Sequence, residues 1–370
     1  MNLSDEIDNY LKNQPFGLNA NEKEAKLLSI LKFQIRHHLN NCTEYKNWYE
    51  SNNFKDPDLI TRIDEVPFIP SSVFKHLNLT SSSKKSKKIT SSGTSSQLKS
   101  SIYIDSKTSL NQTKALSKIL SHFLGSSRKS FFVVDYAPDK KNNNMEMSAR
   151  FAGMSGYLIA SKKTKYLLDQ DYSNEYSVTP SMEVLKNNSS EEPIVIIGYT
   201  YMLWEFIRKL NNAGQKIELP KNSKIIHFGG WKKLANQSIS KAALNEMISR
   251  TFNVQHDQIL DIYGFTEQLG TIYVSQGNKG CIVSDYSSVL IRNTDTLEVL
   301  EDGKKGFLQF ISVLPESYPG FSILNDDIGY ISNRYLNENG SEVIEFLVES
   351  RLKKAEARGC GDTLPENYFL

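Results

Sequence analysis

The chain has 370 residues, of which 44 are lysine or arginine and 42 are aspartate or glutamate, so its formal net charge is only +2. This balance argues against a nucleic-acid-binding protein, which usually carries a pronounced basic surface, and 39% hydrophobic residues are typical of a globular protein. No apolar run approaches the roughly 20 residues of a membrane-spanning helix, and three widely spaced cysteines without a Cys-x-x-Cys pair favour the reducing cytoplasm over a disulfide framework or a zinc site.

The N-terminal part of the chain is predicted to be helical. Apolar residues such as Leu27 and Leu31 recur at helical spacing, which predicts a helix with one buried face over 25–39. His37 and His38 lie in a part of this helix that is rich in Lys, Arg and Asn. We therefore expect both histidines at the surface or in a helix cap.

The middle of the chain alternates predicted strands and helices. Short continuous apolar runs predict buried strands, and longer periodic segments predict the helices between them. In chain order these are a helix over 106–124, strands over 131–135 and 193–198, a helix over 201–210, a strand over 224–228, a helix over 240–252 and a strand over 258–263. Such alternation indicates parallel βαβ units in a layered α/β core. From residue 271 onward the predicted elements are strands, at 281–291, 306–313 and 343–348.

A loop with one glycine, Thr90-Ser-Ser-Gly-Thr-Ser-Ser-Gln-Leu-Lys99, is the most informative motif in the chain. Seven of its ten residues are Ser, Thr or Gly, and Lys99 closes it. Hydroxyls and backbone N–H groups in such a loop can wrap a polyphosphate, and the lysine adds a positive point charge. The stretch before it, 80–88, is rich in Ser and Lys and is expected to be mobile. The sequence therefore predicts a phosphate-binding loop, which we call the glycine loop.

A second motif, Tyr263-Gly-Phe-Thr-Glu267, comes directly after a predicted strand. The carboxyl ends of strands are where ligand crevices form in open α/β sheets. Tyr263 can stack on a base, and Gly264 permits close approach of the backbone to a ligand. Thr266 can bind phosphate, and the Glu267 carboxylate can hold Mg²⁺ as a hard oxygen ligand.

Two weaker motifs have an ordinary structural explanation beside the functional one. In His227-Phe-Gly-Gly-Trp-Lys232, Gly229 and Gly230 would let the main chain pass close to a flat ring, although a tight turn fits the same residues. In Asn325-Asp-Asp-Ile-Gly329, the Asp327 carboxylate could accept both hydroxyls of a ribose, although Asn, Asp and Gly are also turn residues.

A cysteine near the end of the chain is a candidate nucleophile. Cys360 lies in Glu356-Ala-Arg-Gly-Cys-Gly361, where Arg358 favours the thiolate and the flanking glycines favour access. A lone cysteine is more often a small buried residue, but this polar tail is an unusual place for core packing. Cys42 and Cys281 lie within predicted helix or strand patterns and are expected to be structural.

The order of these motifs resembles the adenylate-forming superfamily of acyl-CoA synthetases and nonribosomal adenylation domains. From about residue 25 to its end, the chain is more closely similar to the acyl-protein synthetases of bacterial bioluminescence fatty-acid reductase complexes. The segments that carry the similarity are 66–75, 90–100, 229–232, 326–329 and 358–360. The resemblance implies an α/β fold with the large-domain architecture of adenylate-forming enzymes, in which layered sheets with flanking helices join a β-rich part.

The resemblance also implies ATP and Mg²⁺ as cofactors and assigns residues to them by position. The ATP-binding residues would be Ser91, Ser92, Gly93, Thr94, Gly229, Gly230, Tyr263, Gly264, Thr266 and Asp327, and the catalytic residues would be Lys99, Glu267, Arg351 and Cys360. Glu267 would meet Mg²⁺, and Asp327 would contact the ribose. Arg351 would supply a hinge-side contact to the ribose or phosphate. Cys360 matches the family cysteine that takes the acyl group.

Full adenylate-forming enzymes carry a second domain of about a hundred residues after the hinge, and it brings a catalytic lysine. Here we expect a catalytic domain over 1–350 and a short tail over 351–370 that delivers Cys360 instead. The predicted function is activation of a carboxylic acid, in the family a fatty acid, as acyl-AMP. The acyl group would then move to Cys360 and on to a reductase or acyltransferase partner. Two alternatives stay open, namely a ligase that loads a diffusible thiol such as coenzyme A and a non-catalytic nucleotide-binding scaffold subunit.

Overall fold

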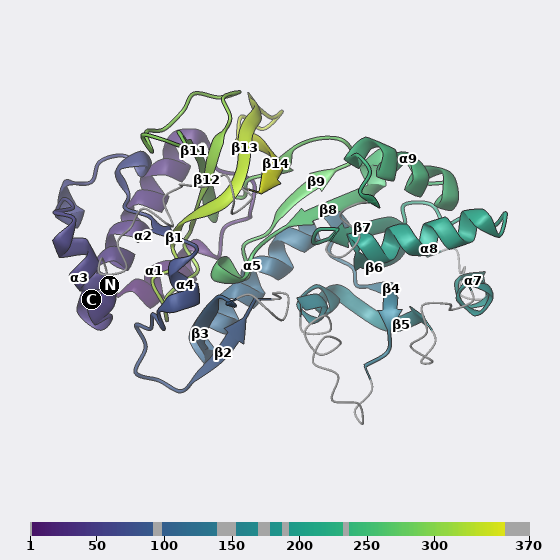
Figure 1. The fold of residues 1–370 in the computed structure, drawn as a ribbon, viewed down its shortest axis with the longest axis horizontal. Coiled ribbons are helices and arrows are strands. Elements are labelled where there is room, and N and C mark those ends of the chain that lie inside the picture. The colour runs from purple at the N-terminus through teal and green to yellow at the C-terminus, as the bar shows by residue number, and fades with distance from the viewer. Residues whose placement is uncertain are drawn as a thin grey trace. The chain divides into compact units, whose positions relative to one another are not determined.

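The computed structural model describes residues 2–91, 98–138, 153–168, 178–186, 192–231 and 237–351. Its chain divides into two compact units (Figure 1). The first unit contains residues 1–118, 264–272 and 282–370, and the second contains residues 119–263 and 273–281. No helix in the part of the chain that the structure describes is long and apolar enough to cross a membrane.

The first unit begins with helices. They are α1 (Leu3–Tyr10), α2 (Ala20–Asn41), α3 (Thr43–Ser51) and α4 (Val73–His76), with the 3-10 turns η1 (Pro57–Leu59) and η2 (Ile63–Glu65) before α4. The prediction of a helix with a buried face over 25–39 is confirmed, since Leu27, Leu31 and Ile35 are all buried on α2. The helix starts earlier than predicted because the Asn19 side chain accepts the Glu22 N–H at 3.0 Å and caps its N-terminus.

His38 was expected at the surface or in a cap, and that expectation is wrong. Its side chain is fully buried, its Nδ1 lies 2.7 Å from Ser81 Oγ, and its ring stacks on Phe321 with centroids 5.4 Å apart. Burial lowers the pKa of His38 well below its ordinary value, so the ring is neutral at physiological pH. His38 lies seven residues after Leu31 on the same helix face, which therefore stays buried beyond the last apolar residue.

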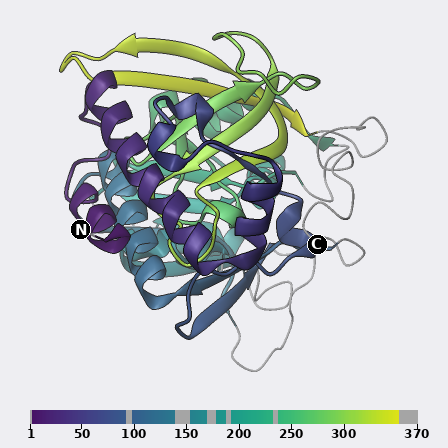
Figure 2. The same cartoon turned by 90° about the vertical axis from the view of Figure 1, so that its left-hand side faces the viewer.

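Four neighbouring strands of the first unit form an antiparallel sheet. Its order is β11 (Ser287–Arg292), β12 (Gly306–Ser312), β13 (Ser322–Leu336) and β14 (Glu342–Arg351). The short strand β1 (Ile69–Pro70) pairs in parallel with the start of β13. Helix α2 packs against this part of the unit (Figure 2), and the Gln34 amide donates to the Val313 and Pro315 carbonyls at 3.1 and 2.9 Å. Every residue of β12 is buried, so this strand forms the centre of the core.

The single strand predicted over 281–291 is wrong, because two strands occupy the range. They are β10 (Cys281–Ile282) and β11, and the N-terminal segment binds to the residues between them. The Asp285 N–H donates to the Pro15 carbonyl at 2.7 Å, and the Asp285 carboxylate accepts the N–H groups of Gly17 and Leu18 at 2.7 and 3.0 Å. Because the Asp285 backbone N–H and carboxylate are hydrogen-bonded to the N-terminal segment, this N–H cannot bond to a neighbouring strand, and the strand is interrupted here.

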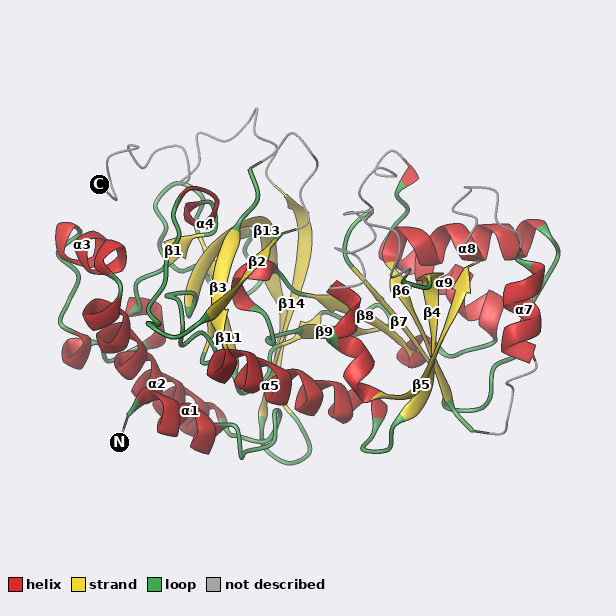
Figure 3. Cartoon of the chain, turned by 90° about the horizontal axis from the view of Figure 1, so that it is seen from below, coloured by secondary structure: helices red, strands yellow, loops and turns green. Residues whose placement is uncertain are grey.

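The second unit has the predicted α/β architecture. Its strands, in sheet order, are β9 (Tyr273–Gln276), β8 (Ile259–Tyr263), β7 (Lys224–Phe228), β6 (Ile194–Tyr199), β4 (Lys129–Tyr136) and β5 (Ser161–Leu168). All neighbouring pairs are parallel except β8 and β9. The remaining elements are α7 (Thr179–Lys186), α8 (Thr200–Asn212), α9 (Lys241–Phe252), η3 (Tyr157–Ala160) and η5 (His256–Gln258). Helices α8 and α9 lie side by side against the strands (Figure 3), which confirms the parallel βαβ units.

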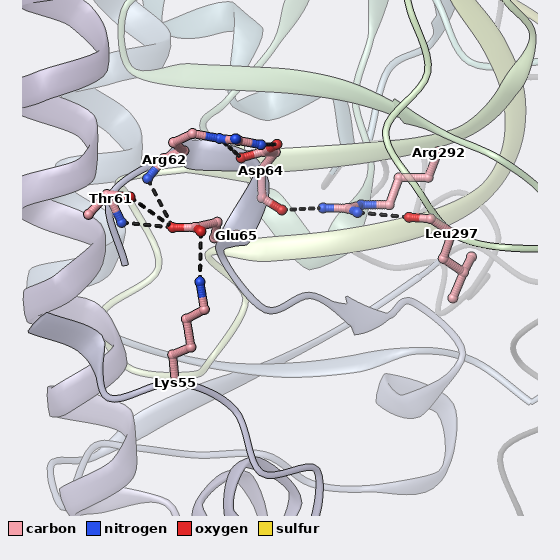
Figure 4. Close-up of polar contacts among 7 residues, drawn as sticks. All are labelled: Lys55, Thr61, Arg62, Asp64, Glu65, Arg292 and Leu297. Atoms are coloured by element: carbon pink, nitrogen blue, oxygen red, sulfur yellow. Dashed lines mark hydrogen bonds and ion pairs between the residues drawn. The ribbon is translucent and has the colours of Figure 1, made fainter. Parts of the chain in front are cut away.

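A buried arginine ties the segment before β1 to the sheet of the first unit. The Arg292 guanidinium donates to the carbonyls of Leu297 and Asp64, both at 2.8 Å (Figure 4). It also donates to the side chain of Gln309 at 2.5 Å. It also lies 4.7 Å from the centroid of the Phe68 ring. Burial lowers the pKa of Arg292 to about 10, which still leaves it charged at physiological pH. This arginine therefore fixes η2, and with it the approach of β1 to β13.

The exposed side of the same segment carries a second set of polar contacts (Figure 4). The Glu65 carboxylate accepts from the Lys55 ammonium and the Thr61 N–H, both at 2.8 Å, and Arg62 pairs with Asp64. Exposed ion pairs of this kind stabilise a fold only weakly. The buried contacts of Arg292 therefore matter more to this segment than the visible surface pairs.

Replacing Arg292 with methionine is expected to destabilise the protein by about 3 kcal/mol, since the buried Gln309 side chain and two half-buried carbonyls lose a charged donor. The measurement is urea unfolding, with the free energy of unfolding extrapolated to water. Arg62→Met is the matched control, because it removes the same group from an exposed position in the same network. A change for Arg292→Met no larger than that for Arg62→Met would contradict the role given to the buried guanidinium.

Candidate functional site

The glycine loop is carried by a β-hairpin. Strands β2 (Ser86–Thr90) and β3 (Ser101–Asp105) pair antiparallel, and the last pair joins Thr90 to Ser101. Beyond it, the Ser91 N–H donates to the Ser100 carbonyl at 3.0 Å and the Ser100 N–H donates to Ser91 Oγ at 3.1 Å. The hairpin thus brings the two ends of the loop together, so residues 92–97 connect two hydrogen-bonded strands.

The residues of the loop itself are only partly described. Ser91 is half-buried and Lys99 is exposed, whereas Ser92, Gly93 and Thr94 lie outside the described residues. The Ser- and Lys-rich stretch over 80–88, which is expected to be mobile, continues into strand β2 from Ser86 onward. Cross-strand contacts stabilise β2 in this position. The register places Lys88 opposite Tyr103, and the Lys88 ammonium lies 5.8 Å from the centroid of the Tyr103 ring.

The base of the hairpin leads straight into α5 (Ser106–Leu124), whose bounds match the predicted helix. Asp105 ends β3, and its carboxylate accepts the Thr108 N–H and the Ser82 hydroxyl, both at 2.8 Å. Burial acts to raise the pKa of Asp105, but these donors outweigh it and leave the pKa lowered. Asp105 is therefore an ionised cap that fixes the angle between the hairpin and the helix.

Glu267 lies in the 3-10 turn η6 (Thr266–Gln268) of the first unit. Its side chain is buried, and its carbonyl accepts the Tyr318 hydroxyl at 2.9 Å. The neighbouring Gln268 amide donates to the Phe310 and Gly320 carbonyls at 2.9 and 2.8 Å. Two side-chain donors therefore hold this turn against the core, which keeps the predicted Mg²⁺ ligand in one place.

Thr266 and Gly264, two residues of the same motif, lie close to Glu267 in the sequence. Thr266 is the first residue of η6 and is half-buried. Gly264 is exposed, and a Cβ added to it would meet only ordinary contacts, the nearest 3.8 Å away on Ile272. Sterics within the protein thus do not require glycine at position 264, so close approach of a ligand is the explanation that stays open for it.

Asp327 lies within β13, opposite Arg351 on β14. The ordinary explanation of this stretch as a polar turn is therefore wrong, because Asn325–Gly329 is part of a strand of 15 residues. Asp327 is 9% exposed, and the register breaks just after it, between Ile328 and Gly329. The irregularity locally bends the strand at the predicted ribose ligand.

In the second unit, Gly229 follows β7 and Tyr263 ends the neighbouring parallel strand β8. Register pairs Phe228 of β7 with Ile262 of β8, so the residues after them lie at the same edge of the sheet. Gly229 has a φ of +74°, and a Cβ there would lie 3.2 Å from the Tyr199 ring, so both backbone and space favour glycine. The half-buried Tyr263 ring lies 6.3 Å from the Tyr273 ring, measured between centroids.

The Gly229 carbonyl is fixed by buried side chains. It accepts the Thr200 hydroxyl at 2.8 Å, and Thr200 Oγ1 lies 3.1 Å from Nδ1 of His227. Asp261 Oδ1 lies 3.6 Å from the same nitrogen. Burial lowers the pKa of His227, so the ring is neutral and hydrogen-bonds to Thr200 beside the Asp261 carboxylate. Gly230, by contrast, has open space around it.

Each unit thus assembles its own part of the predicted site. The first brings Ser91 and Lys99 onto one hairpin, carries Glu267 in η6 and pairs Asp327 of β13 with Arg351 of β14, while the second aligns Gly229 and Tyr263. Cys360, with residues 352–370, lies outside the described residues.

The carboxylate of Glu267 fits Mg²⁺ that is bound together with a nucleotide. Among the residues that the structure describes, no group of three or more His, Cys, Asp or Glu side chains could hold a metal ion. Mg²⁺ usually keeps several waters and takes one or two carboxylates together with substrate phosphates. A single carboxylate from Glu267 therefore suits Mg²⁺ that arrives with ATP, not a resident metal.

Sequence reasoning missed Ser317 and Tyr318. They lie in the segment Pro315–Gly320 between β12 and β13, where two prolines and a glycine are typical of an ordinary loop. Both side chains are fully buried. The only local sign of a buried role was an aromatic residue between a serine and a proline. The hydrogen-bond acceptors of the two side chains, the Glu267 carbonyl for Tyr318 and the Tyr103 carbonyl for Ser317, lie 51 residues or more away in the chain.

Comparison with known proteins places the chain among acid-activating enzymes. A family model described as acyl-protein synthetase, LuxE, matches residues 1–369. A long-chain-fatty-acid–luciferin-component ligase of Vibrio harveyi is 22% identical over 99% of this chain and 94% of its own, and one of Aliivibrio fischeri is 25% identical over 96% and 93%.

The comparison with solved structures confirms the predicted fold class. A 2-hydroxyisobutyryl-CoA ligase, solved with 2-HIB-AMP and CoA, superimposes with a TM-score of 0.64 and 12% identity over 91% of this chain and 71% of that chain. At this identity the likeness shows the fold alone. The chain thus has the α/β architecture of the large domain of adenylate-forming ligases.

Proposed function

Because the chain belongs to the LuxE family of acyl-protein synthetases, we propose that it activates a fatty acid with ATP and then holds the acyl group on Cys360 as a thioester. It is a ligase, as are the Vibrio and Aliivibrio relatives by name. Those names also supply the substrate class, a long-chain fatty acid. The observation that carries the proposal is the hairpin that draws Ser91 and Ser100 together and so closes the glycine loop.

In the first half-reaction, a carboxylate oxygen of the acid attacks the α-phosphorus of ATP. The bond between that phosphorus and the bridging oxygen breaks, so acyl-AMP and pyrophosphate form. Ser91, Ser92, Gly93 and Thr94 would contact the phosphates through hydroxyl and N–H groups, and Lys99 would add positive charge. Positioning and charge neutralisation are the main contributions that phosphate chemistry asks of a protein.

Glu267 would hold Mg²⁺, which supplies further neutralisation of the phosphate charge when it is bound. The buried carboxylate and the anchored turn η6 support this role, because a fixed ligand needs no reorganisation on binding. Thr266 would contact the α-phosphate. Asp327 would accept the ribose hydroxyls, and Arg351 would meet the ribose or a phosphate.

The base of the nucleotide would be met by residues at the ends of β7 and β8. Gly229 and Gly230 would flank the adenine with their main chain, and Tyr263 would stack near it, with Gly264 allowing close approach. The positive φ of Gly229 and the anchoring of its carbonyl by Thr200 support this role, since a preformed backbone surface costs little to organise.

In the second half-reaction, the Cys360 thiolate attacks the acyl carbonyl carbon of acyl-AMP. The bond from that carbon to the phosphate oxygen breaks, AMP leaves, and the thiol proton passes to solvent. The other two cysteines are poor candidates, because Cys42 and Cys281 are buried. Burial also raises the pKa of the Cys42 thiol to about 11. Cys360 is the remaining nucleophile, and an acyl reductase or acyltransferase partner would take its cargo.

The test combines two measurements on the purified full-length chain. With Mg-ATP and a series of acids from aromatic acids to tetradecanoate, we expect acid-dependent exchange of pyrophosphate into ATP and a hydroxylamine-labile acyl adduct in the intact mass spectrum. Exchange without an adduct would point to a diffusible thiol such as coenzyme A as the acceptor. ATP binding without exchange for any acid would overturn the proposal in favour of a nucleotide-binding scaffold.

A further inference from the structure

Ser317 and Tyr318 are adjacent residues that reach two different parts of the proposed nucleotide site. Ser317 contacts β3, the strand that leaves the glycine loop: its Oγ donates to the Tyr103 carbonyl at 2.8 Å and accepts the Asp105 N–H at 3.4 Å. Its own N–H donates to Thr108 Oγ1 at 3.1 Å. One serine therefore holds both the end of the hairpin and the first turn of α5.

Tyr318 reaches the turn that carries Glu267. Its hydroxyl donates to the Glu267 carbonyl at 2.9 Å, and the residue is fully buried. A Cβ added to Gly320 would lie 2.8 Å from the same carbonyl and would collide with the Tyr318 ring. Glycine at position 320 thus leaves room for this hydrogen bond.

The turn η6 depends on such outside support because its own hydrogen bonding is weak. It has three residues, and its backbone bond from the Gln268 N–H to the Phe265 carbonyl is 3.3 Å long. The bond from Tyr318 is shorter, at 2.9 Å. Fixing the Glu267 carbonyl fixes the adjoining peptide plane and so the point from which the Glu267 side chain starts.

We propose that Ser317 and Tyr318 are positioning residues that set the glycine-loop hairpin and the Glu267 carboxylate in one geometry for the phosphates and Mg²⁺ of ATP. The two residues are neighbours on one buried segment, in which Ser317 contacts the hairpin and Tyr318 contacts the turn that carries Glu267. The inference rests on the proposed function. It goes beyond it by naming two residues to which the proposed function gives no role.

The test is calorimetric ATP binding without any acid, as a function of Mg²⁺ concentration, for Tyr318→Phe and Ser317→Ala. For Tyr318→Phe we expect the Mg²⁺ concentration that gives half of the full ATP affinity to rise by about tenfold, the usual cost of removing a group that orients a metal ligand. For Ser317→Ala we expect weaker ATP binding whether or not Mg²⁺ is present, because this change affects the hairpin.

Tyr286→Phe is the matched control. It removes another fully buried hydroxyl that donates to a carbonyl, that of Asn13, in the same unit and remote in sequence from the nucleotide motifs. We expect it to lower the melting temperature as Tyr318→Phe does, with the Mg²⁺ dependence unchanged. If Tyr318→Phe does not fold, Gln268→Leu replaces it, because the Gln268 amide makes the other side-chain hydrogen bonds that hold η6, to the Phe310 and Gly320 carbonyls.

Equal Mg²⁺ dependence in wild type, Tyr318→Phe and Tyr286→Phe would overturn the inference, and so would wild-type ATP binding that is indifferent to Mg²⁺. Pyrophosphate exchange with a fatty acid, measured in parallel on the wild type, tests the proposed function separately. Since the binding experiment uses no acid, a failure of exchange does not alter what it shows about Tyr318.

Discussion

Replacing Cys360 with serine is expected to abolish the acyl-protein adduct and to leave acid-dependent pyrophosphate exchange intact. The two half-reactions share the acyl-AMP but not the nucleophile, so only the second should fail. A serine hydroxyl is almost entirely protonated at neutral pH, whereas a cysteine beside basic residues is partly thiolate. We expect the rate of adduct formation to fall by about 100-fold or more, which corresponds to roughly 2.7 kcal/mol of activation free energy.

Intact mass spectrometry and pyrophosphate exchange, run on the same samples, measure the two half-reactions separately. Cys42→Ala and Cys281→Ala are the controls, since both thiols are buried and neither should carry the acyl group. An adduct that survives in Cys360→Ser and disappears in either control would move the acceptor to that residue. Loss of exchange together with the adduct would instead give Cys360 a part in forming the acyl-AMP.

The elements that the sequence predicted best are those whose burial is decided locally. The helix over 106–124 and the strand over 224–228 have the predicted bounds in α5 and β7. The helix is identified by the periodic spacing of its apolar residues, and the strand is identified by its continuous apolar run. The alternation of strands and helices also predicted the parallel strand pairs of the second unit, because a strand, a helix and a further strand of one sheet have few other ways to pack.

The errors fall where a distant part of the chain decides the outcome. His38 is polar and lies among charged residues, yet it is buried because Ser81 and Phe321 supply a hydrogen bond and a stacking surface. Residues 325–329 have turn composition, but pairing with β14 makes them a strand. No local pattern contains these partners, so no local rule could identify them.

The candidate site divides in the same way. Motif residues such as Glu267 and Gly229 could be named from the sequence because their chemistry is local to a strand end. The groups that hold them could not, since Tyr318 reaches Glu267 across 51 residues and Thr200 reaches Gly229 across 29. Sequence patterns thus found the groups proposed to touch the nucleotide, and the fold was needed to find what orients them.

Replacing Glu267 with glutamine is expected to slow acyl-AMP formation by about 100-fold, the usual cost of losing one group that stabilises transition-state charge. The amide keeps the size of the side chain but removes the negative charge, and a neutral oxygen is a poorer partner for Mg²⁺. The bond from Tyr318 goes to the backbone carbonyl of Glu267, so the turn η6 should keep its position. We therefore expect the melting temperature to change little.

The measurement is pyrophosphate exchange at saturating acid, with both ATP and Mg²⁺ varied. Glu345→Gln is the matched control, since Glu345 is also a buried glutamate of the first unit and its carboxylate accepts from the Tyr335 hydroxyl at 3.3 Å. If the loss of any buried negative charge were the cause, the exchange rate would fall equally in Glu267→Gln and Glu345→Gln. A charge that holds Mg²⁺ against the phosphates would slow only Glu267→Gln, and would make its rate far less responsive to added Mg²⁺. Wild-type exchange in Glu267→Gln would remove this carboxylate from the mechanism and leave Lys99 and the loop as the protein's means of neutralising the phosphates.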